Sequence, residues 1–235
     1  MAFVKANDIT LYYEVRGDGE WLVLIAGLGT DASIFRQCIP YLAEKYKVLV
    51  FDNRGAGQTD KPDAPYSIPM MAEDTVPLMN SLGIESAYVL GVSLGGRIAI
   101  ELALAHPEKV KKLMLVSTSP SVQIKLSGMA KATKRIRSLS KNEQPYYAFL
   151  RQLRASAGYD GTARLKRINI PALIAYGKKD KRLTREQIET MRKNIMGSGL
   201  AEFPGGHIFF ILHNEQFVEA ILNFLSGSEC GDVRK

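Results

Sequence analysis

The stretch Gly91-Val92-Ser93-Leu94-Gly95-Gly96 follows directly on an apolar strand pattern over residues 86–90, and a helical pattern leads out of it. A serine on such a sharp strand-to-helix turn has a strained backbone, and small residues two positions to either side prevent collisions with neighbouring backbone. Gly91 and Gly95 occupy these two positions. The turn therefore presents the Ser93 hydroxyl as a nucleophile and places the Leu94 amide at a helix N-terminus, which favours an anion.

Two further residues complete a predicted catalytic triad, in the order serine, acid, histidine that this kind of turn has. Asp180 lies in a turn after the buried strand pattern of residues 170–176, and His207 follows a short strand pattern at residues 200–203. All three residues come just after the C-terminal end of a predicted strand, where open parallel sheets gather functional groups. We predict Ser93 as nucleophile, His207 as base and Asp180 as the acid that orients it.

Other residues fit these roles less well. His106 precedes the acid in the sequence, and His213 falls within an amphipathic pattern that predicts a position on a helix surface. The segment after the sixth strand, residues 117–120, contains no carboxylate, which favours Asp180 as the acid. The alternatives to catalysis are a structural turn serine, a helix-capping histidine and a solvated turn carboxylate.

Residues 52–59, Asp-Asn-Arg-Gly-Ala-Gly-Gln-Thr, resemble the Asp-x-Arg-Gly-x-Gly-x-Ser loop of the α/β-hydrolase superfamily. Together with the serine turn and the triad order, this resemblance covers nearly the whole chain. Residues 26–29, Ala-Gly-Leu-Gly, occupy the position of the family's His-Gly-x-x oxyanion loop, with Ala26 in place of the usual histidine. The resemblance implies that the backbone N–H of Leu28 joins that of Leu94 in an oxyanion hole.

The order of strand and helix patterns predicts an α/β fold: a mostly parallel eight-stranded sheet with helices on both faces. The family resemblance implies an antiparallel edge formed by the first two strands. Residues 1–119 and 168–235 are predicted to form the α/β-hydrolase core, and residues 120–167 a short basic helical cap. Pro77 is predicted to kink or break the helix that begins after Ser67. The predicted strands lie near residues 2–6, 9–15, 21–26, 46–51, 86–91, 112–117, 171–176 and 200–203.

The predicted cap shows two helical patterns, around residues 125–139 and 144–156. Aromatic residues of the second pattern are candidates to cover the cleft and bind substrate, although ordinary packing onto the core explains them equally well. A short cap leaves an open cleft, which favours small or medium acyl groups. The candidate substrate-binding residues are Tyr146, Tyr147 and Phe149.

Basic residues concentrate in the predicted cap. Residues 121–167 contain eleven basic residues (Lys or Arg) and two acidic ones (one Asp and one Glu). The net charge of the whole chain is +7, so the excess of positive charge comes from this segment. Such a surface steers anionic substrates, or is simply the solvated face of a helix. The sequence contains no nucleic-acid recognition motif, so we expect a small-molecule partner and no nucleic acid.

Composition agrees with a single catalytic domain of 235 residues, 46% of them hydrophobic. The N-terminus lacks the pattern of a signal peptide, and no stretch is apolar enough to span a membrane, so we expect a cytoplasmic protein without membrane contact. The two cysteines have no metal-ligand spacing, and we predict neither a disulfide nor a metal site. No cofactor is expected.

These features predict a serine hydrolase that cleaves carboxylic esters through an acyl-enzyme on Ser93. The resemblance is to carboxylesterases and to members similar to 3-oxoadipate enol-lactonase. Two alternatives stay open. One is a lyase, because Ser-Leu-Gly-Gly-Arg resembles the serine turn of the menaquinone-pathway synthase and makes Arg97 a candidate for gripping an anionic substrate, although a surface or structural role is more common. The other is a non-catalytic ligand-binding receptor.

Overall fold

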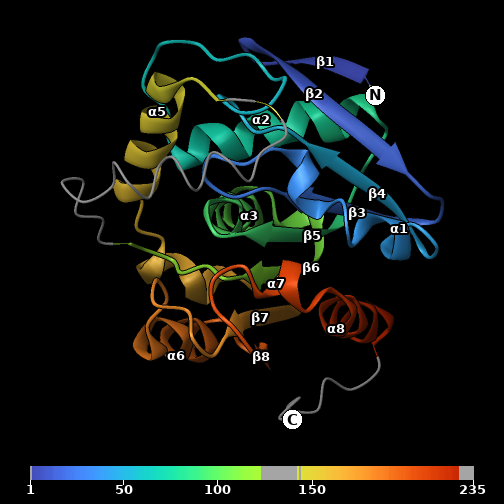
Figure 1. Cartoon of the computed structure of the whole chain (residues 1–235), viewed down its shortest axis with the longest axis vertical. Coiled ribbons are helices and arrows are strands. Elements are labelled where there is room, and N and C mark those ends of the chain that lie inside the picture. Colours follow the sequence, from blue (N-terminus) through green and yellow to red (C-terminus); the bar gives the residue numbers. More distant parts are fainter. Residues whose placement is uncertain (1, 123–141, 143, 228–235) are drawn as a thin grey trace.

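The computed structural model describes residues 2–122, 142 and 144–227, and its centre is one twisted eight-stranded sheet (Figure 1). The strand order is β1-β2-β4-β3-β5-β6-β7-β8. Among the strand pairs of the described residues, β1–β2 and β2–β4 alone are antiparallel, so the predicted mostly parallel sheet with an antiparallel edge is confirmed. The strands are β1 (Ala2–Ala6), β2 (Ile9–Arg16), β3 (Glu20–Ile25), β4 (Tyr46–Phe51), β5 (Ala87–Val92), β6 (Val110–Val116), β7 (Ala172–Gly177) and β8 (Gly199–Phe203).

Helices cover both faces of the sheet, as predicted (Figure 1). Helices α2 (Ile68–Ser81), α3 (Leu94–Ala105) and α6 (Arg185–Asn194) bury their apolar sides in one hydrophobic cluster. The short helices η1 (Ala32–Phe35), α1 (Ile39–Leu42) and α7 (Phe209–Leu212), together with α8 (Asn214–Ser226), contribute to the cluster on the other face. Alternate residues of the central strands feed the two clusters, as the period of two in a strand requires. The sheet is thus a rigid platform that fixes the loops at its C-terminal edge.

Helix α2 runs without interruption through Pro77, and the prediction of a break there is wrong. Ser67 caps the helix by accepting a hydrogen bond from the Met70 amide, as its position before the helix favours. Proline cannot donate to the carbonyl four residues earlier, which would leave that group unpaired. Here the side-chain amide of Asn7 donates to the Glu73 carbonyl at 3.2 Å. This external donor compensates for the proline, so that the helix continues.

The segment between β6 and β7 contains α5 (Tyr146–Ala157) and η4 (Thr162–Arg167). Helix α5 confirms the second helical pattern, beginning after Pro145, whose φ of −56° suits a helix start. The first pattern, over residues 125–139, lies outside the described residues. The division of the chain into a core and a cap therefore stays a prediction. Among the residues that the structure describes, no helix is long and apolar enough to cross a membrane.

The C-terminal amphipathic pattern forms two helices, so the prediction that His213 lies on the surface of a helix is wrong. His213 separates α7 from α8, with backbone angles (φ −124°, ψ 48°) outside the helical range, and it is half-buried. The break lets Phe209 of α7 stack on Phe203 while both contact Phe217 of α8. Burial of three aromatic rings in one cluster outweighs the continuity of a helix.

Candidate active site

Ser93 occupies the turn between β5 and α3, and its backbone is strained. Its φ of 55° lies in the left-handed region that residues with a side chain rarely adopt. A Cβ on Gly91 would collide with the backbone of Gly95, and a Cβ on Gly95 would collide with the carbonyl oxygen of Ile25. Glycine is therefore required on both sides of the serine. Such strain persists only where the surrounding structure imposes it, and it clusters at functional sites.

The structure brings Ser93, His207 and Asp180 into one hydrogen-bonded chain. His207 Nε2 lies 3.1 Å from Ser93 Oγ, and His207 Nδ1 lies 2.8 Å from Asp180 Oδ2. The second carboxylate oxygen of Asp180 accepts a hydrogen bond from the Arg182 amide at 2.9 Å, which fixes the carboxylate plane. The Asp180 side chain is almost fully buried, whereas 18% of the His207 side chain is exposed. Three loops, after β5, β7 and β8, supply the three groups.

Two backbone amides beside Ser93 are available for an anion. Among the described residues, neither the Leu28 nor the Leu94 amide has a hydrogen-bond partner. Leu94 begins α3, so its N–H lies at the positive end of the helix dipole, which stabilises an anion. Leu28 lies on the loop after β3, close to the turn, because a Cβ on the preceding Gly27 would lie 3.5 Å from Ser93 Cβ. The two predicted oxyanion donors are thus brought to the nucleophile.

A cavity of about 770 Å³ opens over the triad. Ser93, His207, Leu28 and Leu94 line it, and so do hydroxyl residues of the segment after β6. The remaining lining comes from α5, the loop after β7 and the start of α6. Beyond Ser93 and His207, the lining includes both hydroxyl and charged side chains. Its other lining residues include Arg97, Ser117, Ser119, Leu153, Ser156, Lys181 and Arg182.

Arg97 lines this cavity and is 6% exposed, so it is not a surface residue. Its guanidinium donates to the Ser119 carbonyl at 3.0 Å, to Ser119 Oγ at 3.1 Å and to Ser156 Oγ at 2.7 Å. All three acceptors are neutral, and no carboxylate among the described residues pairs with it. Burial lowers the pKa of Arg97 to about 10. The wall therefore contains a buried cation whose charge is not compensated.

Of the aromatic candidates in α5, none lines the cavity. Phe149 is fully buried and packs against Leu28 and Leu153, while Tyr146 and Tyr147 are largely exposed. The Tyr147 hydroxyl donates to the Lys61 carbonyl at 2.8 Å. The α5 side chains that face the cavity are instead Leu153 and Ser156.

Several site residues escaped sequence reasoning. Ser117 lines the cavity, has a φ of 46°, and its buried hydroxyl has no partner among the described residues. Gln152 of α5 is fully buried and contacts the loop that carries Leu28. The available signal for Gln152 was its position in the helical stripe of Phe149, Leu153 and Ser156, where a polar residue needs an internal partner.

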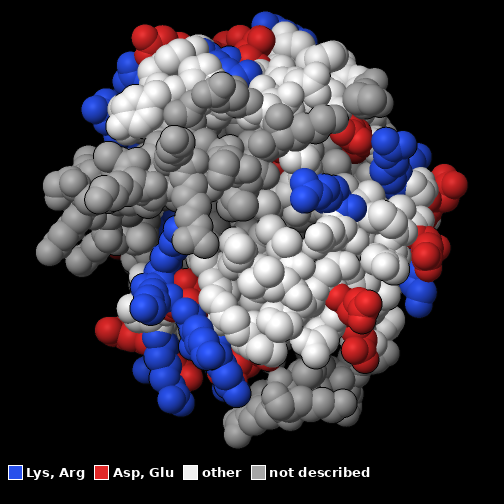
Figure 2. Space-filling view, in the orientation of Figure 1, with Lys and Arg blue, Asp and Glu red and all other residues white. Residues whose placement is uncertain are grey.

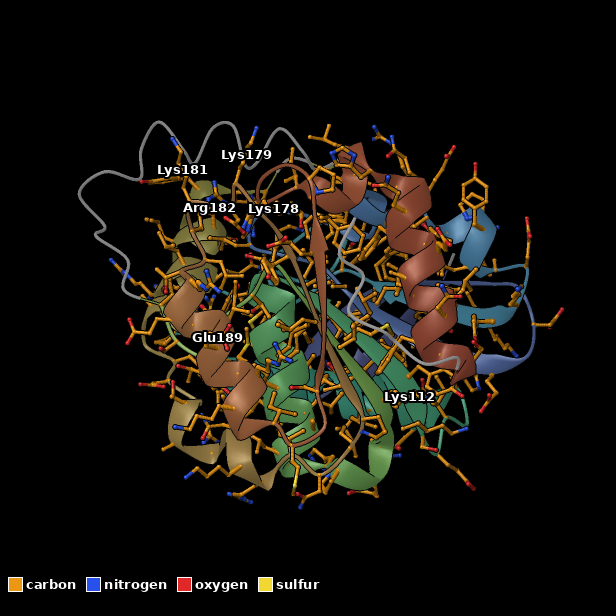
Figure 3. The ribbon with its side chains drawn as sticks, turned by 90° about the horizontal axis from the view of Figure 1, so that it is seen from below. Lys112, Lys178, Lys179, Lys181, Arg182 and Glu189 are labelled. Atoms are coloured by element: carbon orange, nitrogen blue, oxygen red, sulfur yellow. The ribbon has the colours of Figure 1, made fainter. Side chains whose placement is uncertain are left out.

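Lys and Arg side chains gather at the lower left of the face shown in Figure 2. Two basic residues, Lys181 and Arg182, line the cavity. Lys178, Lys179, Lys181 and Arg182 lie on the loop that follows β7 (Figure 3). Lys178 pairs with Glu202 at 3.0 Å, but no carboxylate among the described residues pairs with Lys181 or Arg182. The basic residues 125–141 of the predicted cap lie outside the described part of the chain.

The described residues contain no group of three or more His, Cys, Asp or Glu side chains that could hold a metal ion. Cys38 lies buried in the cluster on the α8 face, and burial raises the pKa of its thiol to about 12. Its thiol is therefore not a nucleophile at neutral pH.

This sheet order, with a serine turn after β5 and a histidine after β8, is that of the α/β-hydrolase fold. The family described as alpha/beta hydrolase fold matches residues 20–134, and solved members share the fold along nearly the whole chain. The chain therefore has the α/β-hydrolase fold, and the family match and the relatives described below support a hydrolase.

Three individual proteins illustrate what this chain is similar to. A protein described as carbamate hydrolase RutD, from Azorhizobium caulinodans, is 28% identical over 99% of each chain. The 3-oxoadipate enol-lactonase 2 of Acinetobacter baylyi is 26% identical over 93% of this chain and 94% of its own. An esterase from Exiguobacterium antarcticum is 25% identical, with a TM-score of 0.85, covering 95% of this chain and 98% of that one.

Proposed function

We propose that this protein is a serine hydrolase that cleaves carboxylic esters through an acyl-enzyme on Ser93. The observation that carries the proposal is the chain from Ser93 Oγ through His207 to the buried Asp180 carboxylate, beside two unpaired amides. A serine hydroxyl is a weak nucleophile unless a base accepts its proton. Here the base lies within hydrogen-bond distance and is itself oriented by a carboxylate.

Acylation follows from this geometry. Ser93 Oγ attacks the ester carbonyl carbon while its proton passes to His207 Nε2, and the carbonyl π electrons move to oxygen. The Leu28 and Leu94 amides donate to that oxyanion. The tetrahedral intermediate then collapses, the bond to the alcohol oxygen breaks, and His207 returns the proton to the leaving alkoxide. The Asp180 carboxylate orients the imidazole and stabilises the imidazolium.

Deacylation repeats the sequence with water as the nucleophile. His207 removes a proton from water as the hydroxyl oxygen attacks the acyl carbon, and the same amides receive the second oxyanion. Collapse breaks the bond to Ser93 Oγ, which regains the proton from His207. The products are the carboxylic acid and a free enzyme.

The relatives support a substrate with a reactive carbonyl. Their names denote hydrolysis of a carbamate, an enol-lactone and an ester. The test is a panel of p-nitrophenyl esters, an enol-lactone and a carbamate, each assayed with wild type and with Ser93→Ala. Turnover of an ester or lactone that requires Ser93 would support the proposal. Turnover of the carbamate alone would shift the substrate class, and binding without turnover would favour the receptor.

The second candidate function is the lyase on an anionic substrate, and Arg97 is the observation that favours it. A buried guanidinium with only neutral partners is costly unless a ligand supplies the opposite charge. It also lies in the first turn of α3, where the helix dipole disfavours a cation. Ser117, with its unpartnered hydroxyl in the same wall, offers a further donor. We propose that the substrate carries a carboxylate, whether the reaction is the hydrolysis or the elimination.

Arg97→Met should reduce activity selectively toward an anionic substrate. We expect kcat/KM for p-nitrophenyl hemisuccinate to fall by about 30-fold or more, because losing one partner of a buried charge pair costs about 2–5 kcal/mol. The rate for neutral p-nitrophenyl butyrate should change little, and it serves as the internal control for folding. Equal losses with both esters would assign Arg97 a structural role through Ser119 and Ser156.

A further inference from the structure

Gln152 connects α5 to two loops of the sheet through a fully buried hydrogen-bond network. Its side-chain oxygen accepts from the Gly29 amide at 3.2 Å, and its side-chain nitrogen donates to the Arg54 carbonyl at 2.8 Å. Gln144 donates to the same Gln152 oxygen at 3.1 Å and to the Gly55 carbonyl at 2.7 Å. Gln152 is 0% exposed, so water does not substitute for these bonds.

The oxyanion loop, residues 26–30, is held from two sides. From the sheet side, Asn53 donates to the Ala26 carbonyl at 2.9 Å, and within the loop the Thr30 hydroxyl donates to the Gly27 carbonyl at 3.0 Å. These bonds fix the residues before Leu28. From the α5 side, Phe149 and Leu153 pack against Leu28, and the Gln152 side-chain oxygen accepts a hydrogen bond from the Gly29 amide.

We propose that Gln152 is a positioning residue for the oxyanion-binding amide of Leu28. This inference rests on the proposed function, because it acts on the same oxyanion hole. Gly29 has a φ of 70°, and its amide is directed into the α5 contact. An acceptor is needed for that amide and a donor for the Arg54 carbonyl. The primary amide of glutamine supplies both groups. One side chain therefore fixes the position of the loop after β3 relative to the loop after β4.

A purely structural role has a different signature. If Gln152 only satisfied buried backbone groups, its loss would lower stability without changing the chemical step selectively. Positioning predicts a change in transition-state stabilisation at constant ground-state binding. The two roles are therefore separated by kcat against KM, and by the affinity for a transition-state analogue.

Gln152→Met retains the length of the side chain but removes its donor and acceptor. We expect kcat for p-nitrophenyl acetate to fall about 10- to 100-fold with KM nearly unchanged, since small displacements of a catalytic group cost up to about 10²-fold. The matched control is Arg151→Gln, which removes the 2.9 Å ion pair with Asp63 from the adjacent residue of α5. This control should retain the wild-type kcat.

Trifluoroacetone tests the oxyanion hole directly. Ser93 Oγ bonds to its carbonyl carbon, the serine proton passes to His207, and the carbonyl oxygen becomes the oxyanion of a tetrahedral adduct. Its inhibition constant should rise in Gln152→Met by the same factor as kcat/KM falls. Arg151→Gln should not change it.

Hydrogen–deuterium exchange gives a readout that does not require activity. The peptide containing Gly29 should exchange faster in Gln152→Met than in wild type or Arg151→Gln, because its amide has lost its acceptor. If the methionine variant does not fold, Gln152→Asn is the alternative, because it keeps the amide and shortens the side chain by one methylene. It should change kcat, ketone affinity and exchange at Gly29 in the same direction but by less.

Two failures are distinguishable. A folded Gln152 variant with wild-type kcat, unchanged ketone affinity and unchanged exchange at Gly29 would overturn the positioning role alone. Hydrolysis that persists in Ser93→Ala would instead overturn the proposed function, and the exchange measurement would still decide whether Gln152 holds the loop.

Discussion

Ser93→Ala should abolish both ester turnover and labelling by a fluorophosphonate, with a loss in kcat on the order of 10⁶-fold. The loss is this large because the serine and its base act as one unit, and only the residual catalysis of the oxyanion hole and of substrate binding remains. The substitution to alanine retains the turn, and deleting the hydroxyl removes no contact that holds the fold. The measurements are steady-state kinetics and mass spectrometry of the labelled peptide.

The control for this experiment is Ser81→Ala, at the exposed end of α2. It should retain wild-type labelling and turnover. Fluorophosphonate found on a residue other than Ser93 in the wild-type enzyme would contradict the assignment of the nucleophile.

Asp180→Asn should lower kcat by about 10⁴-fold while the structure is retained. The carbonyl oxygen of the substituted side-chain amide can still accept from the Arg182 amide, which turns the side-chain NH₂ group toward His207 Nδ1. The imidazole must then accept at Nδ1 and carry its proton on Nε2. In that tautomer it cannot take the proton of Ser93.

Substrate affinity should change far less than turnover in Asp180→Asn, since the carboxylate does not line the cavity. Asp18→Asn, in the exposed turn before β3, is the matched control and should behave as wild type. A near-wild-type kcat for Asp180→Asn would show that the serine and histidine work as a dyad.

The parts of the fold and site that could be predicted are those with local causes. The strain at Ser93 requires glycines at fixed spacing, and Asp180 and His207 each follow a strand that ends in a turn. The mostly parallel sheet with helices on both faces follows from the alternation of β and α patterns. Such signals lie within a few residues of the feature that they predict.

Features that depend on contacts between distant segments could not be predicted. The neutral surroundings of Arg97 arise because Ser119 and Ser156 approach from different elements. Gln152 meets Gly29 across 123 residues of sequence. Helix α2 continues through Pro77 because Asn7, from the turn after β1, reaches its open carbonyl.

The position of β8 at the edge of the sheet makes the base the least protected member of the triad. In the described part of the chain β8 has β7 as its single neighbour, and His207 lies on the loop that follows β8. Edge elements open locally at lower free energy than the centre of a sheet. The chain's single tryptophan, Trp21, lies on β3, which pairs with strands on both sides. In urea, catalytic activity should therefore disappear before Trp21 fluorescence changes, so that the enzyme is switched off by partial opening well before it unfolds.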